Sequence, residues 1–108
     1  VILGCNQTSR AYLIDDNENY GEKIIINKDT FVIGRLKSVV DYEITNKTVG
    51  KTHAKFIKQD NKYYLVDLES KNGTYINSTK LMPNSLYEVE DGASIVFSNV
   101  KYTFNIEK

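Results

Sequence analysis

VKYTFNI, residues 100–106, alternates apolar and polar side chains with a period of two. Successive side chains of a β-strand point to opposite faces, so this stretch predicts a strand with one buried and one exposed face. The even-numbered residues, from Val100 to Ile106, form the predicted buried face. Elsewhere in the chain, no stretch of ten or more residues shows the 3.6-residue period of an amphipathic helix. The chain is therefore predicted to be all-β.

The rest of the chain repeats short apolar runs separated by turn-forming residues. The runs are rich in Ile, Val, Tyr, Phe and Thr, side chains that fit a half-buried pleated surface. The predicted strands are Ala11–Ile14, Lys23–Ile26, Phe31–Gly34, Tyr42–Ile44, Ala54–Lys58, Tyr63–Leu68, Thr74–Asn77, Lys80–Met82, Leu86–Val89, Ser94–Phe97 and Val100–Ile106. So many short strands without helices are typical of a β-sandwich or a closed barrel, and the strand pattern alone fits both.

The composition excludes several classes of function. The 108 residues fit one domain, and 14 Lys and Arg against 14 Asp and Glu argue against a nucleic-acid binder. The single cysteine, Cys5, allows no internal disulfide, and the single histidine, His53, allows no histidine-rich metal site. No apolar run is long enough to cross a membrane. We therefore expect a cytoplasmic, metal-free domain without membrane contact.

The ends of the chain are less informative than its middle. The chain begins at Val1 rather than at methionine, so we expect it to be part of a larger protein. The weakly patterned residues 1–10 are predicted to flank a domain that spans residues 11–108. Cys5 lies in the flanking segment, and we expect it to be incidental.

The zero net charge hides two charged segments. Six cations and only two anions lie between Arg35 and Lys58, whereas four acids and no base lie between Tyr12 and Glu22. One interpretation is that these charges only keep the domain soluble. The other is that the loops carrying Arg35 and Lys51 form an anion site.

Two motifs in the cationic segment carry side chains suited to binding. Gly34–Arg35 ends the apolar run Phe31–Ile33, so the arginine would emerge at a strand end. A guanidinium is suited to binding phosphate or carboxylate with two parallel hydrogen bonds, but Gly-Arg taken alone is more often only a bend followed by a surface arginine. His53 follows a polar loop and is expected to hold that loop by hydrogen bonds. Catalysis is not indicated, since the chain has no Gly-x-Ser-x-Gly motif and no paired histidine and carboxylate.

The third motif reads DLESKNGTYIN, residues 67–77. Asn72–Gly73 between two predicted strands indicates a hairpin turn, because both residues tolerate positive φ. A hairpin with no further role is one interpretation of this motif. Asp91–Gly92 is interpreted as a second turn of this kind.

The three motifs, in this order and at this spacing, resemble the forkhead-associated (FHA) domain. Leu81, Asp91–Gly92, Ile95–Phe97 and the final strand are also similar to the family, so the resemblance runs from Ala11 to Ile106. It implies an eleven-stranded β-sandwich with binding loops at one end. It also implies a phosphopeptide-binding module, chiefly for phosphothreonine, that is not an enzyme and needs no cofactor.

The resemblance further implies roles for individual residues. Arg35 is the phosphate anchor, and Asn72 hydrogen-bonds the main chain of the bound peptide. The positions implied to contact phosphate are Arg35, Gly50, Lys51 and Lys71, and those implied to contact peptide are Asn72 and Thr52. The positions implied to hold the loops in shape are Gly34, His53, Gly73 and Thr74.

Gly50 is the main departure from the family, which usually has a serine there whose hydroxyl bonds the phosphate. A hydrogen bond to a charged group contributes about 1.5–3 kcal/mol, so its loss would weaken binding roughly ten- to a hundredfold. Lys51 and Lys71 stand where the family often has arginine and a hydroxyl residue, and their ammonium groups would be less directional substitutes. Thr48 or Thr52 could supply another hydroxyl.

Two functional hypotheses follow from the resemblance. The first is a monomeric phosphothreonine-peptide-binding module that recruits a partner phosphorylated by a Ser/Thr kinase. The second is an FHA-fold interaction or structural domain that has lost phosphate binding, as Gly50 permits. An enzyme or sugar-binding sandwich is disfavoured by the absence of tryptophan, of a metal cluster motif and of a catalytic pair.

Asn77–Ser78, where the family commonly has Asn-Gly, predicts only a different turn.

Overall fold

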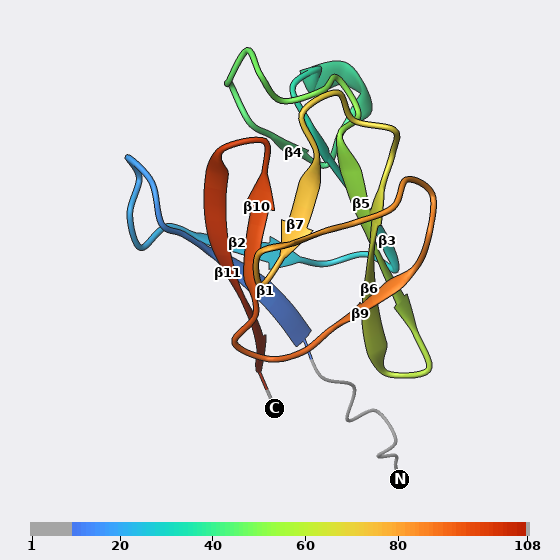
Figure 1. Ribbon diagram of the computed structural model, residues 1–108. Helices are drawn as coiled ribbons and strands as arrows, with labels where there is room; N and C mark the ends of the chain where they lie inside the picture. Colours follow the sequence, from blue (N-terminus) through green and yellow to red (C-terminus); the bar gives the residue numbers. More distant parts are fainter. Residues whose placement is uncertain (1–9, 108) are drawn as a thin grey trace, which may run out of the picture.

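The computed structural model describes residues 10–107, which form eleven strands and one short 3-10 turn (Figure 1). All eleven predicted strands are present, and their ends differ from the predicted ones by no more than two residues. Cys5 lies outside the described residues. The elements are β1 (Arg10–Asp15), β2 (Lys23–Ile26), β3 (Thr30–Gly34), η2 (Lys37–Val39), β4 (Tyr42–Glu43), β5 (Ala54–Gln59), β6 (Lys62–Asp67), β7 (Thr74–Ile76), β8 (Thr79–Lys80), β9 (Tyr87–Val89), β10 (Ser94–Phe97) and β11 (Val100–Glu107).

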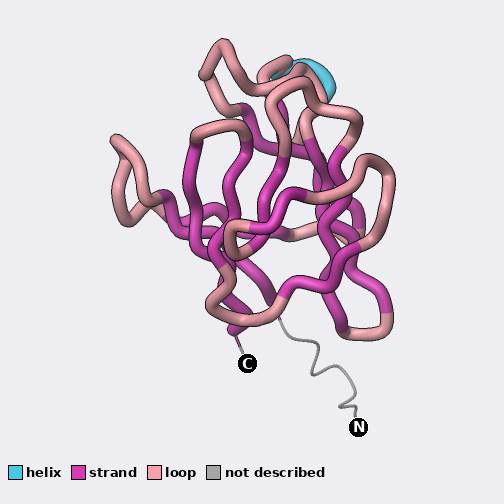
Figure 2. Tube along the Cα trace, in the orientation of Figure 1, coloured by secondary structure: helices cyan, strands magenta, loops and turns pink. Residues whose placement is uncertain are grey.

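The strands form two sheets that pack against each other (Figure 2). One sheet has six strands in the order β2-β1-β11-β10-β7-β8, and the other has five in the order β4-β3-β5-β6-β9. Neighbouring strands are antiparallel except β3 and β4, which run parallel with Ile33 opposite Tyr42. Two separate sheets make the fold a β-sandwich, which confirms the predicted fold class and excludes the closed barrel.

The core lies between the inward faces of the two sheets. In β11 the residues Val100, Tyr102 and Phe104 are buried while Lys101 is exposed, as the period-two pattern predicted. Phe104 stacks on Phe56 of β5 in the opposite sheet, with ring centroids 5.6 Å apart. Each fully buried side chain of this size stabilises the fold by about 1.5–3 kcal/mol. Burial of these alternating positions therefore holds the two sheets together.

Two turns differ from the sequence-based interpretation. Asn72–Gly73 is not a hairpin turn, because β6 and β7 belong to different sheets and only Gly73 of the pair has a positive φ, 90°. Asp91–Gly92 likewise lies between strands of different sheets, β9 and β10. Asn77–Ser78 is a two-residue hairpin turn, with φ values of 48° and 73° and Ile76 paired to Thr79. Positive φ at both central residues suits the twist of paired strands.

The loops that follow β3, β4 and β6 gather at one end of the sandwich, the top of Figure 1, and the carboxyl end of β11 lies at the other. The loop after β6 connects the two sheets, which pack about 10 Å apart in a sandwich. Arg35, Lys51 and Lys71 therefore belong to neighbouring loops although they are far apart in the sequence. Between residues 10 and 107, no helix has the length and apolar character to cross a membrane.

Candidate functional site

Arg35 follows directly on the last residue of β3, and two hydrogen bonds fix it to the loop between β4 and β5. Its backbone N–H donates to the Gly50 carbonyl over 2.9 Å, and its side-chain Nε donates to the Val49 carbonyl over 2.9 Å. No acceptor among residues 10–107 engages its two terminal Nη nitrogens. Arg35 is exposed to solvent, so these nitrogens remain available to an anion.

Gly34 allows the loops carrying Arg35 and Lys51 to touch. A Cβ at this position would lie 2.2 Å from the Lys51 carbonyl oxygen, far inside van der Waals contact. The same carbonyl accepts a hydrogen bond from the Leu36 N–H over 3.2 Å. The glycine is therefore required by this close backbone approach.

His53 is fully buried and connects two loops. Its Nδ1 accepts a hydrogen bond from the Gly50 N–H over 2.9 Å, so Nε2 carries the proton and donates it to the Gly73 carbonyl over 2.9 Å. Burial lowers the pKa of His53, and smaller effects of the Gly73 carbonyl and the Asp67 carboxylate oppose this change. The ring is neutral near pH 7, as both hydrogen bonds require.

The loop between β6 and β7 is shaped by Asp67 and Ser70, two residues to which the sequence analysis assigned no role. Asp67 is buried, and its Oδ1 accepts from the Thr74 hydroxyl over 2.6 Å and from the Ser70 hydroxyl over 2.5 Å. Ser70 Oγ in turn accepts from the Gly73 N–H over 3.0 Å. The sequence signal that could have indicated this network is the Asp-x-x-Ser spacing, which places both side chains within one short loop. The network shapes the loop that carries Lys71.

Asn72 links its loop to the neighbouring one. Its Nδ2 donates to the Thr48 carbonyl over 2.8 Å, and the side chain is exposed. Its Oδ1 receives no hydrogen bond from residues 10–107. Asn72 can therefore still accept from, and donate once more to, the main chain of a bound peptide.

The two threonines proposed as substitute hydroxyls differ in their surroundings. Thr48 Oγ1 donates to Asn46 Oδ1 over 2.6 Å and accepts from Ser98 Oγ over 2.7 Å. Its single proton is committed, so it cannot also donate to a phosphate. Thr52 is exposed, and its hydroxyl is not engaged by any side chain in the described part of the chain.

Lys51 and Lys71 are exposed and form no ion pair with any of residues 10–107. Lys51 lies on the loop that touches Gly34, and Lys71 precedes Asn72 on the loop bound to Thr48. The two ammonium groups thus belong to loops that are hydrogen-bonded to each other, and no carboxylate of residues 10–107 pairs with them. Their arrangement favours an anion at this end of the molecule.

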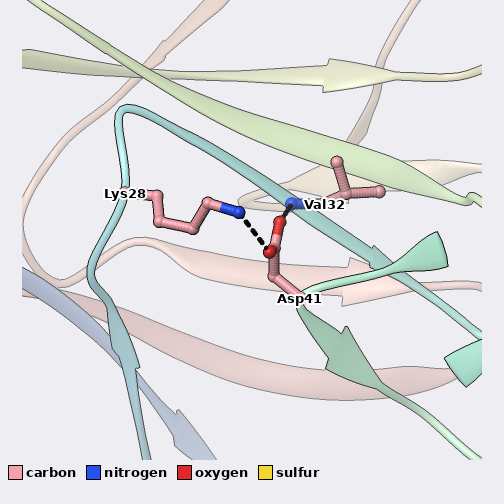
Figure 3. A network of polar contacts seen from close by, with 3 residues as sticks. All are labelled: Lys28, Val32 and Asp41. Carbon is pink, nitrogen blue, oxygen red and sulfur yellow. Dashed lines mark hydrogen bonds and ion pairs between the residues drawn. The ribbon is translucent and has the colours of Figure 1, made fainter. Parts of the chain in front are cut away.

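Asp41 attaches the end of the loop between β3 and β4, which carries Arg35, to β3 (Figure 3). Its Oδ2 accepts from the Val32 N–H over 2.7 Å, and its Oδ1 accepts from Lys28 Nζ over 2.8 Å. The hydrogen bond from Lys28 and that from Val32 lower the pKa of the Asp41 carboxyl. No motif in the sequence indicated this contact, which joins residues nine and thirteen positions apart.

Comparison with known proteins places these features in a family. A model of the FHA domain matches residues 31–98 of the chain. The chain is 33% identical over 87 residues to a probable serine/threonine-protein kinase, fhkC, of Dictyostelium discoideum, across 77% of this chain and 14% of the kinase. It therefore spans only a small part of that relative.

Two solved structures share the architecture. Mycobacterium tuberculosis EmbR, in complex with a low-affinity phosphopeptide, has a TM-score of 0.85 and 26% identity, covering 97% of this chain and 26% of that one. The MEK1 FHA domain, in complex with a phosphothreonine peptide of HOP1, has a TM-score of 0.76 and 25% identity, covering 91% and 97%. The family model spans more than half of the chain, and the two-sheet sandwich agrees with it. This chain therefore belongs to the FHA domain family.

Proposed function

We propose that the domain binds a Thr-phosphorylated peptide, with the phosphate at the loops that follow β3, β4 and β6. The attachment of Arg35 carries this proposal. Its backbone N and its Nε are both fixed to the neighbouring loop, while its terminal nitrogens are free of acceptors within residues 10–107. A guanidinium held in this way loses little freedom when it forms two parallel hydrogen bonds to a phosphoryl group.

The charge around Arg35 supports a doubly charged ligand. A phosphothreonine carries about −1.5 to −2 charges at pH 7. Lys51 and Lys71 lie on adjoining loops without a counter-ion among the described residues, and Asn72 retains groups that can fix the main chain of the peptide. A mobile ammonium approaches such an anion as a point charge.

The relatives support the choice of ligand. The MEK1 FHA domain was solved with a phosphothreonine peptide, and EmbR with a phosphopeptide. We extend this ligand class to the present chain and expect its partner to be the product of a Ser/Thr kinase. The proposal assigns no catalytic step, cofactor or nucleic acid to the domain.

A phosphate-independent interaction domain is the second candidate, and Gly50 favours it. Gly50 offers no hydroxyl to a phosphate, and the Thr48 proton is committed to Asn46. Losing one hydrogen bond to a charged group weakens binding roughly ten- to a hundredfold. Binding would then depend on Arg35 and on the two ammonium groups.

The experiment compares a degenerate phosphothreonine peptide library with unphosphorylated and phosphoserine versions by fluorescence anisotropy. We expect phosphate-dependent binding at concentrations of tens of micromolar, loss of at least about tenfold in affinity in Arg35→Ala, and a smaller loss in Arg35→Lys. Lys62→Ala removes an exposed cation at the β5–β6 turn, at the opposite end of the molecule (Figure 1), and should bind as the wild type.

Two results would overturn the proposal in different ways. If no phosphate-dependent binding is found at these concentrations, the phosphate-independent domain is the correct candidate. If phosphate-dependent binding survives Arg35→Ala, the domain binds phosphopeptides at another place.

A further inference from the structure

A cavity of about 370 Å³ lies between the β1–β2 loop, the β4–β5 loop and the turn between β10 and β11. It is separate from Arg35, Lys51, Lys71 and Asn72, none of which lines it. Its walls are attached to one another, since Asn17 of the β1–β2 loop exchanges two hydrogen bonds with the backbone of Lys101. The cavity is thus part of the folded structure rather than a gap between free loops.

The lining of this cavity is negative. It includes three acids and no lysine, arginine or histidine: the acids are Asp15, Glu18 and Glu43. None of them forms an ion pair with a residue in the described part of the chain. Two tyrosines complete the wall, and burial, followed by the charge of Glu22, raises the pKa of Tyr42. Burial, followed by Tyr42, likewise raises the pKa of Tyr102. Both phenols stay neutral at pH 7, so the acids leave the cavity with a net negative charge.

Asp15 indicates which kind of group this negative cavity can bind. The residue is only 3% exposed, and its Oδ1 accepts from the N–H and the Nδ2 of Asn17 over 2.6 and 2.8 Å. Its Oδ2 receives no hydrogen bond from residues 10–107. Every fully buried side-chain oxygen or nitrogen among these residues has a hydrogen-bond partner, so Oδ2 is not fully buried. Oδ2 is therefore accessible from the cavity that Asp15 lines. An accessible oxygen on an otherwise buried carboxylate is best satisfied by a charged donor.

The cavity adjoins the proposed phosphate site. Asn46 lines the cavity and bonds Thr48, whose carbonyl accepts from Asn72. From Asn46 to Gly50 the β4–β5 loop spans at most about 14 Å, since an extended chain covers at most about 3.6 Å per residue. An extended peptide rises about 3.3 Å per residue, so about four residues bridge this span.

We propose that this cavity binds a lysine or arginine side chain of the same peptide whose phosphothreonine lies at Arg35. The inference rests on the proposed function and sharpens it, because it names the ligand as a phosphothreonine peptide with a basic residue within about four positions. The ammonium or guanidinium group bonds Asp15 and the flanking glutamates, and the tyrosines of the wall contact its apolar stem. Asp15, Glu18 and Glu43 thereby have a role that complements the cationic loops.

The test uses a phosphothreonine peptide array in which Lys, Arg, Ala or Glu is placed in turn at each of the five positions on either side of the phosphoresidue. Wild-type protein should prefer Lys or Arg over Glu at one of these positions by about three- to tenfold, because Glu exchanges the attraction of a partly exposed charge pair for a repulsion of similar size. The double variant Glu18→Gln, Glu43→Gln changes solvent-accessible or half-buried groups and leaves Asp15 in place, so it should reduce this preference while still binding the alanine peptide. Glu88→Gln, an exposed acid on β9 outside the cavity, is the matched control and should keep the preference.

Each outcome bears on one of the two proposals or on both. Phosphate-dependent binding without a preference for Lys or Arg at any position, or a preference that is undiminished in the double variant, overturns this inference and leaves the proposed function intact. A preference reduced equally in Glu88→Gln also overturns it, because the effect is then one of overall charge. The absence of any phosphate-dependent binding overturns both.

Discussion

Replacing Gly34 by alanine tests the close contact on which the candidate site depends. The added Cβ would lie 2.2 Å from the Lys51 carbonyl oxygen and 2.7 Å from its carbon. Both contacts involve backbone, which cannot rotate away as the end of a flexible side chain can. The two loops must therefore separate by about 1.2 Å to bring the oxygen to 3.4 Å, where ordinary contact begins.

The cost follows from the bonds that cross this contact. Separation breaks or lengthens the hydrogen bonds from Arg35 N to Gly50 O, 2.9 Å, and from Leu36 N to Lys51 O, 3.2 Å. Each contributes about 0.5–1.5 kcal/mol, and overpacking costs about 1–3 kcal/mol. We expect Gly34→Ala to lower the free energy of unfolding by about 2–6 kcal/mol, a large part of the about 5–15 kcal/mol typical of a domain.

Urea unfolding followed by circular dichroism measures this loss, and thermal unfolding should show a decrease in Tm of at least about 10 °C. Gly50→Ala is the matched control, because a Cβ there lies 3.6 Å from His53 Cα, an ordinary contact. Its stability should be unchanged or up to about 1 kcal/mol higher, since alanine restricts the unfolded chain.

A Gly34→Ala protein as stable as the wild type would refute this reasoning. It would mean that the two loops are not in backbone contact in solution. If the stability falls but phosphopeptide affinity is retained at a temperature where the variant is folded, the contact supports the fold and does not position Arg35.

Three further predictions concern single groups at the same end of the molecule. Gly50→Ser introduces a hydroxyl at a position where a side chain fits, and should tighten phosphopeptide binding about tenfold in anisotropy titrations. Gly50→Ala should give no gain. Equal affinities of Gly50→Ser and the wild type would show that the lysines already replace the hydroxyl. The pKa of His53 is lowered on folding, so its contribution to stability is complete above the unfolded pKa, near 6.5, and declines as the pH falls below that value. Urea midpoints that stay constant from pH 7 to pH 5 would contradict the buried neutral ring. The pKa of Asp41 is also lowered, so Asp41→Asn should reduce the free energy of unfolding at pH 7. The difference in stability from the wild type should shrink as the pH falls below about 4. A difference that is the same at pH 7 and pH 3 would exclude the charged hydrogen bonds from Lys28 and Val32.

Much of the fold could be predicted because it depends on local pattern. The alternation in residues 100–106 and the ten other apolar runs match the eleven observed strands, since burial of every second side chain is a property of the strand itself. The turn at Asn72–Gly73 could not be predicted in the same way. Its two residues are compatible with a hairpin, and the outcome was decided by β6 and β7 pairing in different sheets.

The candidate site shows the same division between local and long-range information. Gly34, Arg35, His53 and Asn72 could be selected from their motifs, although the roles of Arg35 and Asn72 stay predictions. The contributions of Asp67, Ser70 and Asp41 were not assigned, because each depends on which backbone groups lie within hydrogen-bond distance. That distance follows from the path of a loop in space.

The sequence by itself determined the strands, their buried faces and the family, because short-range alternation and ordered motifs are written along the chain. Only the tertiary structure decided that the strands form two sheets and that Asp67 and Ser70 shape the Asn72 loop. It also decided that Asp15, Glu18 and Glu43 line a cavity beside the cationic loops. The physical reason is that these features join residues from separate loops, and packing of the two sheets sets which loops meet.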